Sequence, residues 1–488
     1  MSAGMDLISL LAPEVFLAIS ALGCLLYGAL TGRNSFSRIA LVCIICLMLA
    51  LLFLLFSGNS GKTSDANGLV VIDQFSVFMK TLVILGACAG IIFSVDFNRR
   101  EAIEKFEYPV IIIFSVIGMM LMISSNDLIT LYLGLELQSL SLYVLASFKR
   151  DSVRSTEAGL KYFVLGALSS GMLLYGASLV YGFTGTTQFS AIAQAILEAE
   201  EVTNNRISLG LLFGLVFVLA GLAFKVAAAP FHMWSPDVYE GAPTPVTAYF
   251  SMAPKIAATA LLIRVVVEPF GPLTAQWQQI LWVVSVLSMA VGAFAAIWQT
   301  NIKRLMAYSS IGHIGYALIG LVTGGRLGVA AVALYLAIYL FMTLVSFGAI
   351  LAMRVQGRVV EGISDLSGLS KTHPILAIAL AGVMFSMAGI PPLAGFFAKF
   401  YIFDAAIRSG FFYLAIIGVA SSVVGSFYYL RIIKVMFFDG VSESLDRPVN
   451  GTLNAMIAVG AVVTFFFFIL PAPLVEAADA AAASLFPG

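Results

Sequence analysis

The sequence predicts an all-α, polytopic membrane helix bundle of about fourteen transmembrane helices. The chain is 60% hydrophobic and 11% charged, with a mean hydropathy of +1.01, whereas a soluble domain carries about 25% charged residues. Apolar runs near the bilayer-crossing length of roughly 20 residues follow one another along the chain. The alternating strands of about ten residues that are typical of membrane barrels are absent, so helices are the expected spanning elements.

The predicted helices form a single membrane domain over residues 1–488. Residues 12–95 supply three N-terminal helices, 108–267 a first five-helix unit, 278–437 a second such unit, and 452–472 the last helix. The predicted segments are 12–30, 38–57, 74–95, 108–124, 127–147, 158–183, 208–232, 244–267, 278–298, 303–322, 328–353, 374–403, 411–437 and 452–472.

Proline interrupts the seventh and the twelfth segments. Pro230 lies near the end of AFKVAAAPFHMW, and Pro391 and Pro392 lie at the centre of FSMAGIPPLAGFFAKFYIF. Proline removes a backbone donor and kinks a helix, and broken helices at matching positions of two halves favour inverted repeats around an ion site. We therefore expect two inverted five-helix repeats. The match is imperfect, because Lys225 precedes its proline whereas Lys399 follows its pair.

Basic residues are distributed unequally between the two sets of turns. One set holds sixteen of them: Arg33, Arg38, Arg99, Arg100, Lys105, Lys149, Arg150, Arg154, Lys303, Arg304, Arg354, Arg358, Lys371, Arg431, Lys434 and Arg447. The opposite set holds five: Lys62, Arg206, Arg264, Arg326 and Arg408. Because cytoplasmic turns carry the excess of Lys and Arg, we expect both termini to be periplasmic, in a bacterial inner membrane. The formal net charge of zero gives no indication of a nucleic-acid partner.

Charged residues inside the predicted spans are the candidates for chemistry. Each charge at the bilayer centre costs about 2.5–3.5 kcal/mol, so such residues should face the bundle interior. Lysine suits a proton carrier, because burial disfavours its ammonium form and a nearby carboxylate favours it. Glu136, Lys225, Lys255 and Lys399 are therefore the candidate proton carriers, although Glu136 could also serve only as a structural partner.

Two further lysines allow two interpretations each. Lys161 lies one turn inside its span and four residues after Glu157, so it could snorkel to the surface or serve a proton path. Lys80 lies near the outer end of the third span, where snorkelling is at least as good an explanation as function.

Two histidines complete the candidate set. His313, in YSSIGHIGY, shares a helical face with Ser309 and Tyr316, a pattern that fits a wet path and equally a structural histidine. His232 ends the seventh span near the predicted cytoplasmic surface and is a candidate proton-uptake relay.

The sequence predicts no metal site and no redox centre in this chain. All four cysteines lie in apolar runs, and the spacing of Cys43 and Cys46 has no second ligand pair nearby. The three histidines do not lie at one depth on two helices, where axial haem ligands are usually found.

Three long motifs resemble one family. They are KVAAAPFHMWSPDVYEGAPTPVTAYFSMAPKIA at 225–257, KRLMAYSSIGHIGYALIG at 303–320 and GIPPLAGFFAKFYIF at 389–403. The chain resembles the N-type antiporter-like subunits (subunit 2) of respiratory complex I, the proton-pumping NADH:quinone oxidoreductase, over essentially its whole length.

The resemblance implies roles for the candidate residues. Glu136 would pair with Lys225 and control its proton, Lys255 would link two half-channels with help from His313, and Lys399 would be the exit-side carrier. Lys161 and His232 resemble accessory positions on the inner path.

The resemblance also implies partners and cofactors. Flavin, iron–sulfur clusters, NADH and quinone are expected in partner subunits, and none in this chain. The expected partners are other antiporter-like and small membrane-arm subunits, the hydrophilic NADH-oxidising arm and the lipid bilayer.

The predicted function is proton translocation in a membrane arm, coupled to electron transfer in partner subunits. One rival is a subunit of a multisubunit Na⁺/H⁺ antiporter, which shares the fold and the charged residues but is disfavoured by the three motifs. A second rival is a non-transporting scaffold, which would gain nothing from the insertion cost of its central lysines.

Overall fold

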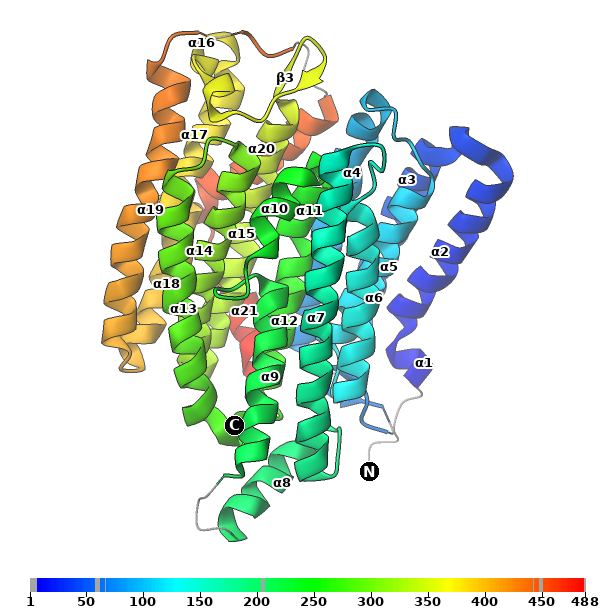
Figure 1. The fold of residues 1–488 in the computed structure, drawn as a ribbon, viewed down its shortest axis with the longest axis vertical. Helices are drawn as coiled ribbons and strands as arrows, with labels where there is room; N and C mark the ends of the chain where they lie inside the picture. The colour runs from blue at the N-terminus through cyan, green and yellow to red at the C-terminus, as the bar shows by residue number, and fades with distance from the viewer. Residues whose placement is uncertain are drawn as a thin grey trace.

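The computed structural model describes residues 7–57, 62–65, 67–202, 207–441, 443–446 and 451–486, which form a bundle of long helices (Figure 1). The helices are α1 Leu7–Leu10, α2 Ala12–Thr31, α3 Phe36–Ser57, α4 Gln74–Arg100, α5 Glu107–Ile123, α6 Leu128–Ala146, α7 Val153–Thr184, α8 Phe189–Val202, α9 Leu209–Val226, α10 Trp234–Gly241, α11 Thr244–Ser251, α12 Ala253–Val267, α13 Thr274–Ile297, α14 Ile302–Val322, α15 Arg326–Ala352, α16 Leu369–Thr372, α17 Pro374–Ala388, α18 Ala394–Arg408, α19 Phe412–Phe438, α20 Gly451–Phe466 and α21 Ala472–Ala483. The strands are β1 Thr63–Ser64, β2 Val71–Ile72, β3 Arg354–Val355 and β4 Arg358–Val359.

Most predicted segments correspond to one long helix. Among the described residues, twelve segments are long and apolar enough to cross a membrane. The predicted segment 108–124 corresponds to the shorter α5, and 374–403 to α17 and α18 together. The structure is thus the helix bundle that the sequence predicts, while the count of fourteen crossings stays a prediction.

Polar side chains cap several of these helices at their first turn. Asp73 and Ser76 form a capping box at the start of α4. Asp127 and Asn301 accept backbone N–H bonds in the first turns of α6 and α14. These bonds satisfy backbone donors that have no partner within the helix, and so fix where each span begins.

Three of the membrane segments are broken, one more than the sequence predicts. The predicted breaks separate α9 from α10 and α17 from α18, where Ala227 and Gly389 adopt left-handed φ values of 60° and 92°. The additional break lies at Met252, between α11 and α12, and Pro254 occupies the first turn of α12. Proline cannot donate a helical hydrogen bond, which favours a helix start here.

Two local features of the first half, an isolated bridge and a helix break, recur in the second half. The isolated bridge between Asp127 and Gln188 recurs between Asn301 and Gly362. In Figure 1, α9 lies below its break and α10 above it, whereas α17 lies above its break and α18 below it. The two halves therefore carry matching breaks in opposite directions.

Basic residues from the turns predicted to be cytoplasmic gather at one end of the bundle. Arg100, Lys149, Arg154, Lys303 and Arg358 line a single cavity there, at the end that carries α16 and β3 in Figure 1. Helix α1, the first described element of the chain, lies in the opposite half of that view. Arg206, Arg447 and the terminal residues 1–6 and 487–488 lie outside the described residues, so the periplasmic placement of the termini stays a prediction.

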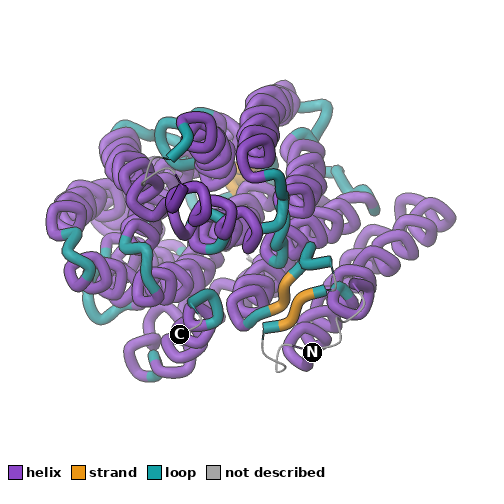
Figure 2. Tube along the Cα trace, turned by 90° about the horizontal axis from the view of Figure 1, so that it is seen from below, coloured by secondary structure: helices purple, strands orange, loops and turns teal. Residues whose placement is uncertain are grey.

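The sequence analysis misses several shorter elements. Helix α8 lies within the predicted link 184–207, and α21 follows the last predicted segment and packs against α4 and α15. The antiparallel pair β1–β2 lies near the N-terminus in the view from below (Figure 2), and β3–β4 forms a second pair. These strands are only two residues long, too short for an alternating pattern to be recognised.

Lys80 does not snorkel to the surface. Its ammonium lies 2.5 Å from Glu14 Oε1, and the side chains of Lys80 and Glu14 are 0% and 3% exposed. This buried ion pair joins α4 to α2, so the snorkelling alternative for Lys80 is wrong. Glu14 lies near the start of the first predicted span, where the sequence analysis took no account of it.

Candidate functional site

Lys225 occupies the last turn of α9, beside the first break. It is buried, and its ammonium donates hydrogen bonds to Ser139 Oγ at 2.8 Å and Ser170 Oγ at 3.4 Å. The Tyr143 ring centre lies 5.9 Å away. Two hydroxyls and an aromatic face thus solvate a charge that would otherwise be costly in the membrane interior.

Glu136 lies one helical turn before Ser139 on α6. It is half-buried, and its Oε1 atom is buried with no hydrogen-bond partner among the described residues. No ion pair within 4 Å joins Glu136 to Lys225 in the part of the chain that the structure describes. In this structure, Ser139 therefore holds the ammonium that the sequence analysis expects Glu136 to hold.

Lys255 lies in the first turn of α12, directly after the break at Met252. It is 2% exposed, and its ammonium contacts Ser310 Oγ on α14. The centre of the Tyr239 ring on α10 lies 5.2 Å from the same ammonium. The break at Met252 thus brings a central lysine into contact with elements of both halves.

His313 is the centre of a hydrogen-bonded group of tyrosines. Its Nδ1 atom lies 2.5 Å from the Tyr335 hydroxyl on α15, and its Nε2 atom lies 3.1 Å from the Tyr429 hydroxyl on α19. The Tyr429 hydroxyl also lies 2.5 Å from Ser309 Oγ. His313 and Ser309 share this partner, which agrees with the shared helical face predicted for them.

Lys399 points back to the helix end before its own break. Its ammonium donates to the carbonyl oxygens of Met387 and Ala388 at 2.8 Å and 3.2 Å, and to Ser422 Oγ at 2.7 Å. The Tyr316 ring centre lies 4.8 Å away. The last carbonyls of a helix carry partial negative charge, so the end of α17 is a natural partner for a cation.

Helix α14 joins the central site to the second-half site. Its residues Ser310 and Tyr316 contact Lys255 and Lys399 respectively, and His313 lies between them on the same helix. A small cavity next to α14 is lined by side chains that include those of His313, Tyr316 and Lys399. His313, Tyr316 and Lys399 thus share one cavity, and Ser310, the partner of Lys255, lies three residues before His313 on the same helix. Hydroxyl and imidazole groups can both donate and accept protons.

Lys161 and its neighbours form a second polar group, at the end of the bundle. The Lys161 ammonium lies 2.8 Å from both Asp237 Oδ2 and Glu157 Oε1. Arg304 binds the other oxygen of Asp237 at 2.6 Å. These side chains line a cavity of about 230 Å³. The Lys161 side chain reaches the surface, as the snorkelling interpretation requires. It does so within a cluster of charged side chains that could also accept and donate protons.

His232 lies in the connection between α9 and α10, close to this cluster in sequence. It is half-buried, and its Nδ1 atom is buried without a hydrogen-bond partner among the described residues. His232 thus follows the buried end of α9 and precedes α10, the helix that carries Asp237 of the cavity wall, and its role as an uptake relay stays a prediction.

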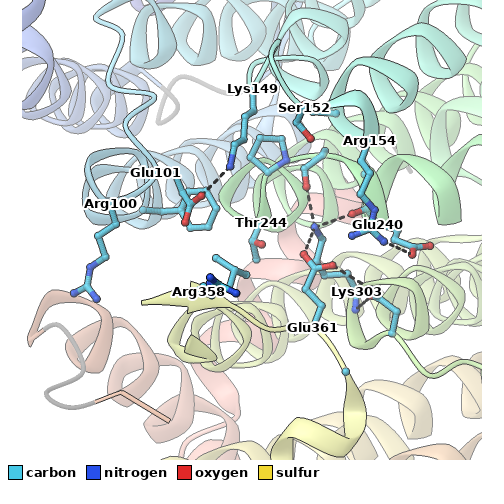
Figure 3. Close-up of a pocket in the computed structure, with 18 of the residues that line it drawn as sticks. Arg100, Glu101, Lys149, Ser152, Arg154, Glu240, Thr244, Lys303, Arg358 and Glu361 are labelled. Carbon is cyan, nitrogen blue, oxygen red and sulfur yellow. Dashed lines mark hydrogen bonds and ion pairs between the residues drawn. The ribbon is translucent and has the colours of Figure 1, made fainter. Parts of the chain in front are cut away.

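A larger cavity of about 880 Å³ opens at the same end (Figure 3). Ion pairs cross it, including Lys149 with Glu101 at 2.8 Å and Lys303 with Glu361 at 2.9 Å. Burial raises the pKa of Glu361, but Lys303 outweighs this and holds that pKa below its usual range. The charges of the cavity wall are therefore largely paired with one another.

The described residues contain no group of three or more His, Cys, Asp or Glu placed to hold a metal ion. Cys24, Cys43, Cys46 and Cys88 are buried and free.

Sequence reasoning missed the hydroxyl partners of the candidate lysines. Ser139, Ser170, Ser310 and Ser422 each come from a different helix than the lysine they contact. Serine is common in membrane helices and often bonds its own backbone, so no single-sequence signal sets these four apart. The helical periodicity around Lys225 or Lys399 identifies neighbours on the same helix, so it could not identify serines on other helices.

Comparison with known proteins gives a consistent result. The family model described as "NADH:quinone oxidoreductase/Mrp antiporter, TM" matches residues 125–425. A curated relative from Paramagnetospirillum magneticum, named NADH-quinone oxidoreductase subunit N, is 53% identical over 483 residues and 99% of both chains. The protein of the same name from Rhodospirillum rubrum is 56% identical over 97% of this chain and 96% of its own.

Two solved structures are also similar. A chain of respiratory complex I from Thermus thermophilus, with bound aureothin, has a TM-score of 0.82 and 31% identity, and the match covers 96% of this chain and 99% of that one. A chain of the Mrp complex from a Dietzia species has a TM-score of 0.85 and 25% identity, over 99% and 98%.

Proposed function

The chain belongs to the NADH:quinone oxidoreductase/Mrp antiporter family, and within it to the subunit N group, and we propose that it moves protons through half-channels built on Glu136, Lys225, Lys255 and Lys399. It is a multi-pass membrane-arm subunit of an NADH-quinone oxidoreductase complex. Electron transfer in partner subunits supplies the driving force.

The contacts of α14 support this proposal best. A proton that leaves Lys255 meets Ser310 first. His313 lies three residues further along α14 and is hydrogen-bonded to Tyr429 of α19, which also contacts Ser309. Each hydroxyl can accept one proton while donating its own, so the series needs only local rotation to pass a charge. A helix with purely structural contacts would not need this run of paired polar groups in a lipid environment.

Glu136 is proposed to control Lys225 without touching it in the state described. The ammonium is held by Ser139, one turn along α6, so a small movement of the Lys225 side chain changes its partner. Proximity to the carboxylate favours the charged amine, and separation favours release of the proton. Movement between these two positions would load and unload the carrier.

Two inverted five-helix repeats, 108–267 and 278–437, are part of the proposal. The recurring bridges and the oppositely directed breaks support them. Inverted repeats place equivalent sites at opposite depths, so one half serves the inner face of the membrane and the other serves the outer face. Residues 12–95 and 452–472 are the additional helices outside the repeats.

The proposed setting is the inner membrane of a bacterium, with the basic end of the bundle cytoplasmic and both termini periplasmic. Large apolar side chains cover much of the described outer surface, including Leu26, Phe56, Ile375 and Phe438, and suit contact with lipid and neighbouring membrane subunits. Flavin, iron–sulfur clusters, NADH and quinone are proposed to bind partner subunits, in the hydrophilic arm and at its junction with the membrane.

The Na⁺/H⁺ antiporter alternative is less well supported. Identity to the subunit N relatives is 53–56%, against 25% to the Mrp chain.

Proton pumping by the assembled complex tests the proposal. Lys225→Ala and Lys399→Ala should lower the ratio of protons pumped to electrons transferred in vesicles that hold equal amounts of complex. A wild-type ratio in both variants, with assembly intact, would leave the chain as a scaffold.

A further inference from the structure

Two landmarks align the helix breaks of the two halves. Ala227 and Gly389 each end a helix in the left-handed conformation. Pro230 and Pro392 follow them at the same spacing. Residues after the two breaks can therefore be compared position by position.

Asp237 and Lys399 fall at the same position after these landmarks. Asp237 lies on α10 and Lys399 on α18, the helices that follow the two breaks. In Figure 1, α10 runs towards one end of the bundle and α18 towards the other. The first half thus has a carboxylate where the second half has a buried lysine.

Asp237 is held by one cation on each oxygen. Lys161 lies 2.8 Å from Oδ2, and Arg304 lies 2.6 Å from Oδ1. The side chain is 34% exposed and faces the cavity of about 230 Å³ at the bundle end. Water in that cavity can therefore reach the carboxylate.

Both cations have a second carboxylate within reach. Lys161 also lies 2.8 Å from Glu157 Oε1, and Arg304 lies 3.1 Å from Glu240 Oε2. Each cation can therefore leave Asp237 and still keep one carboxylate partner. The free-energy cost of this move is small compared with the cost of breaking an isolated ion pair.

We propose that Asp237 is the proton-collecting carboxylate of the first half, the counterpart of Lys399, and that Lys161 and Arg304 gate it. This inference rests on the proposed proton-translocating function. While both cations bind Asp237, the carboxylate is ionised and closed to protons. When they move to Glu157 and Glu240, it takes a proton from water in the cavity, passes it inward, and returns to its ionised form.

The opposing influences on Asp237 fit this switch. Burial raises the pKa of Asp237, and the hydrogen bonds and charges of Lys161 and Arg304 outweigh burial, so the pKa lies below its usual range. If the two cations move away, burial becomes the dominant influence on the pKa of Asp237, and burial favours the protonated acid. The other charged groups facing this cavity are Glu157 and Arg154 from α7 and Glu240 from α10.

Helix α10 links Asp237 to the central lysine. Tyr239 follows two residues later, and its ring faces the Lys255 ammonium. Asp237 and Tyr239 both lie on α10, a helix of eight residues. A movement of α10 that follows a change at Asp237 can therefore reach Lys255 without passing through another helix.

The test uses the intact complex in vesicles and measures the proton-to-electron ratio as a function of pH. Asp237→Asn keeps the shape but cannot collect a proton, and we expect a lower ratio that depends less on pH than that of the wild type. Asp237→Glu should restore pumping with a shifted pH profile. Asp479→Asn is the matched control, because Asp479 also binds an arginine, Arg326, at 2.5 Å but lies outside the cavity.

The outcomes separate the inference from the proposed function. If Lys399→Ala lowers the ratio and Asp237→Asn leaves ratio and pH profile unchanged, the inference fails and the proposed function stands. If neither variant changes the ratio, the proposed function fails as well. Should Asp237→Asn not assemble, Asp237→Glu decides, since an unchanged pH profile in that variant also overturns the inference.

Discussion

The Lys225 ammonium donates to Ser139 Oγ at 2.8 Å, and Ser139 lies one helical turn after Glu136 on α6. The hydroxyl holds the amine away from the carboxylate in the state described. In the proposed mechanism, a second position of the Lys225 ammonium beside Glu136 would favour the protonated amine, and the position at Ser139 would favour release of the proton.

Ser139→Ala should reduce proton pumping without preventing assembly. Loss of a hydrogen bond to a charged group costs about 1.5–3 kcal/mol, which is roughly tenfold or more in the balance between the two positions of Lys225. The measurement is the proton-to-electron ratio in vesicles with equal complex content. Ser141→Ala is the control, because the hydrogen bond that Ser141 makes among the described residues is to the carbonyl of Leu137 on its own helix. Equal pumping by the two variants would remove Ser139 from the mechanism.

Lys399→Ala should impair pumping in an assembled complex. The ammonium donates to the carbonyl oxygens of Met387 and Ala388 at the end of α17, so the substitution removes both the proposed carrier and these two hydrogen bonds. Ser422→Ala, which removes one of three partners, should give a smaller loss. A normal ratio for Lys399→Ala would exclude the exit-side role.

The breaks, the buried lysines and the helical character could be predicted from the sequence because each has a local signal. Prolines marked the two breaks, and isolated charges in apolar runs marked Glu136, Lys225 and Lys399. The partners of these charges could not be predicted, because they lie on other helices. The break at Met252 has no glycine or proline at the break itself, and only Pro254 hints at it.

Buried ion pairs between distant segments could not be predicted from the sequence either. The sequence analysis assigned Arg264 to a turn, yet it is fully buried and binds both oxygens of Asp73, at 2.9 Å and 3.0 Å. Asp73 lies far away in sequence, before α4. Pairing across such a separation is decided by tertiary packing, which a single sequence does not reveal.

Asp73→Asn should destabilise the complex. Breaking a buried pair by removing one partner typically costs about 3–5 kcal/mol, because the remaining charge is uncompensated. Burial raises the pKa of Asp73, but Arg264 outweighs it and the pKa falls below its usual range. The stabilisation is therefore present above the unfolded pKa of about 3.9 and is lost as the pH falls through the lower folded pKa.

Thermal inactivation of the purified complex at neutral pH measures this loss. Asp73→Asn should inactivate at a lower temperature, and Asp479→Asn, at an exposed pair with Arg326, should behave like the wild type. Equal inactivation of the two variants would show that the Arg264–Asp73 pair does not anchor α4.

The basic end of the bundle should face the cytoplasm. In a cysteine-free background, Val153→Cys at the start of α7 should react with an impermeant thiol reagent only in inside-out vesicles. Ser409→Cys, in the turn between α18 and α19, should react only in right-side-out vesicles. Periplasmic labelling at position 153 would reverse the proposed orientation.

Lys225→Arg should keep the positive charge beside Ser139 and lose pumping. Arginine does not release its proton at accessible pH. If Lys225 must deprotonate to carry a proton, the variant cannot pump; if Lys225 is only a structural cation, its role is kept. Glu136→Gln should impair loading, and Lys225→Ala should remove the carrier. If Glu136 and Lys225 act as a unit, the double variant Glu136→Gln, Lys225→Ala should pump no worse than Lys225→Ala alone. Proton-to-electron ratios in vesicles with equal amounts of complex decide both points. Additive losses would show independent residues, and wild-type pumping by Lys225→Arg would exclude Lys225 as a carrier.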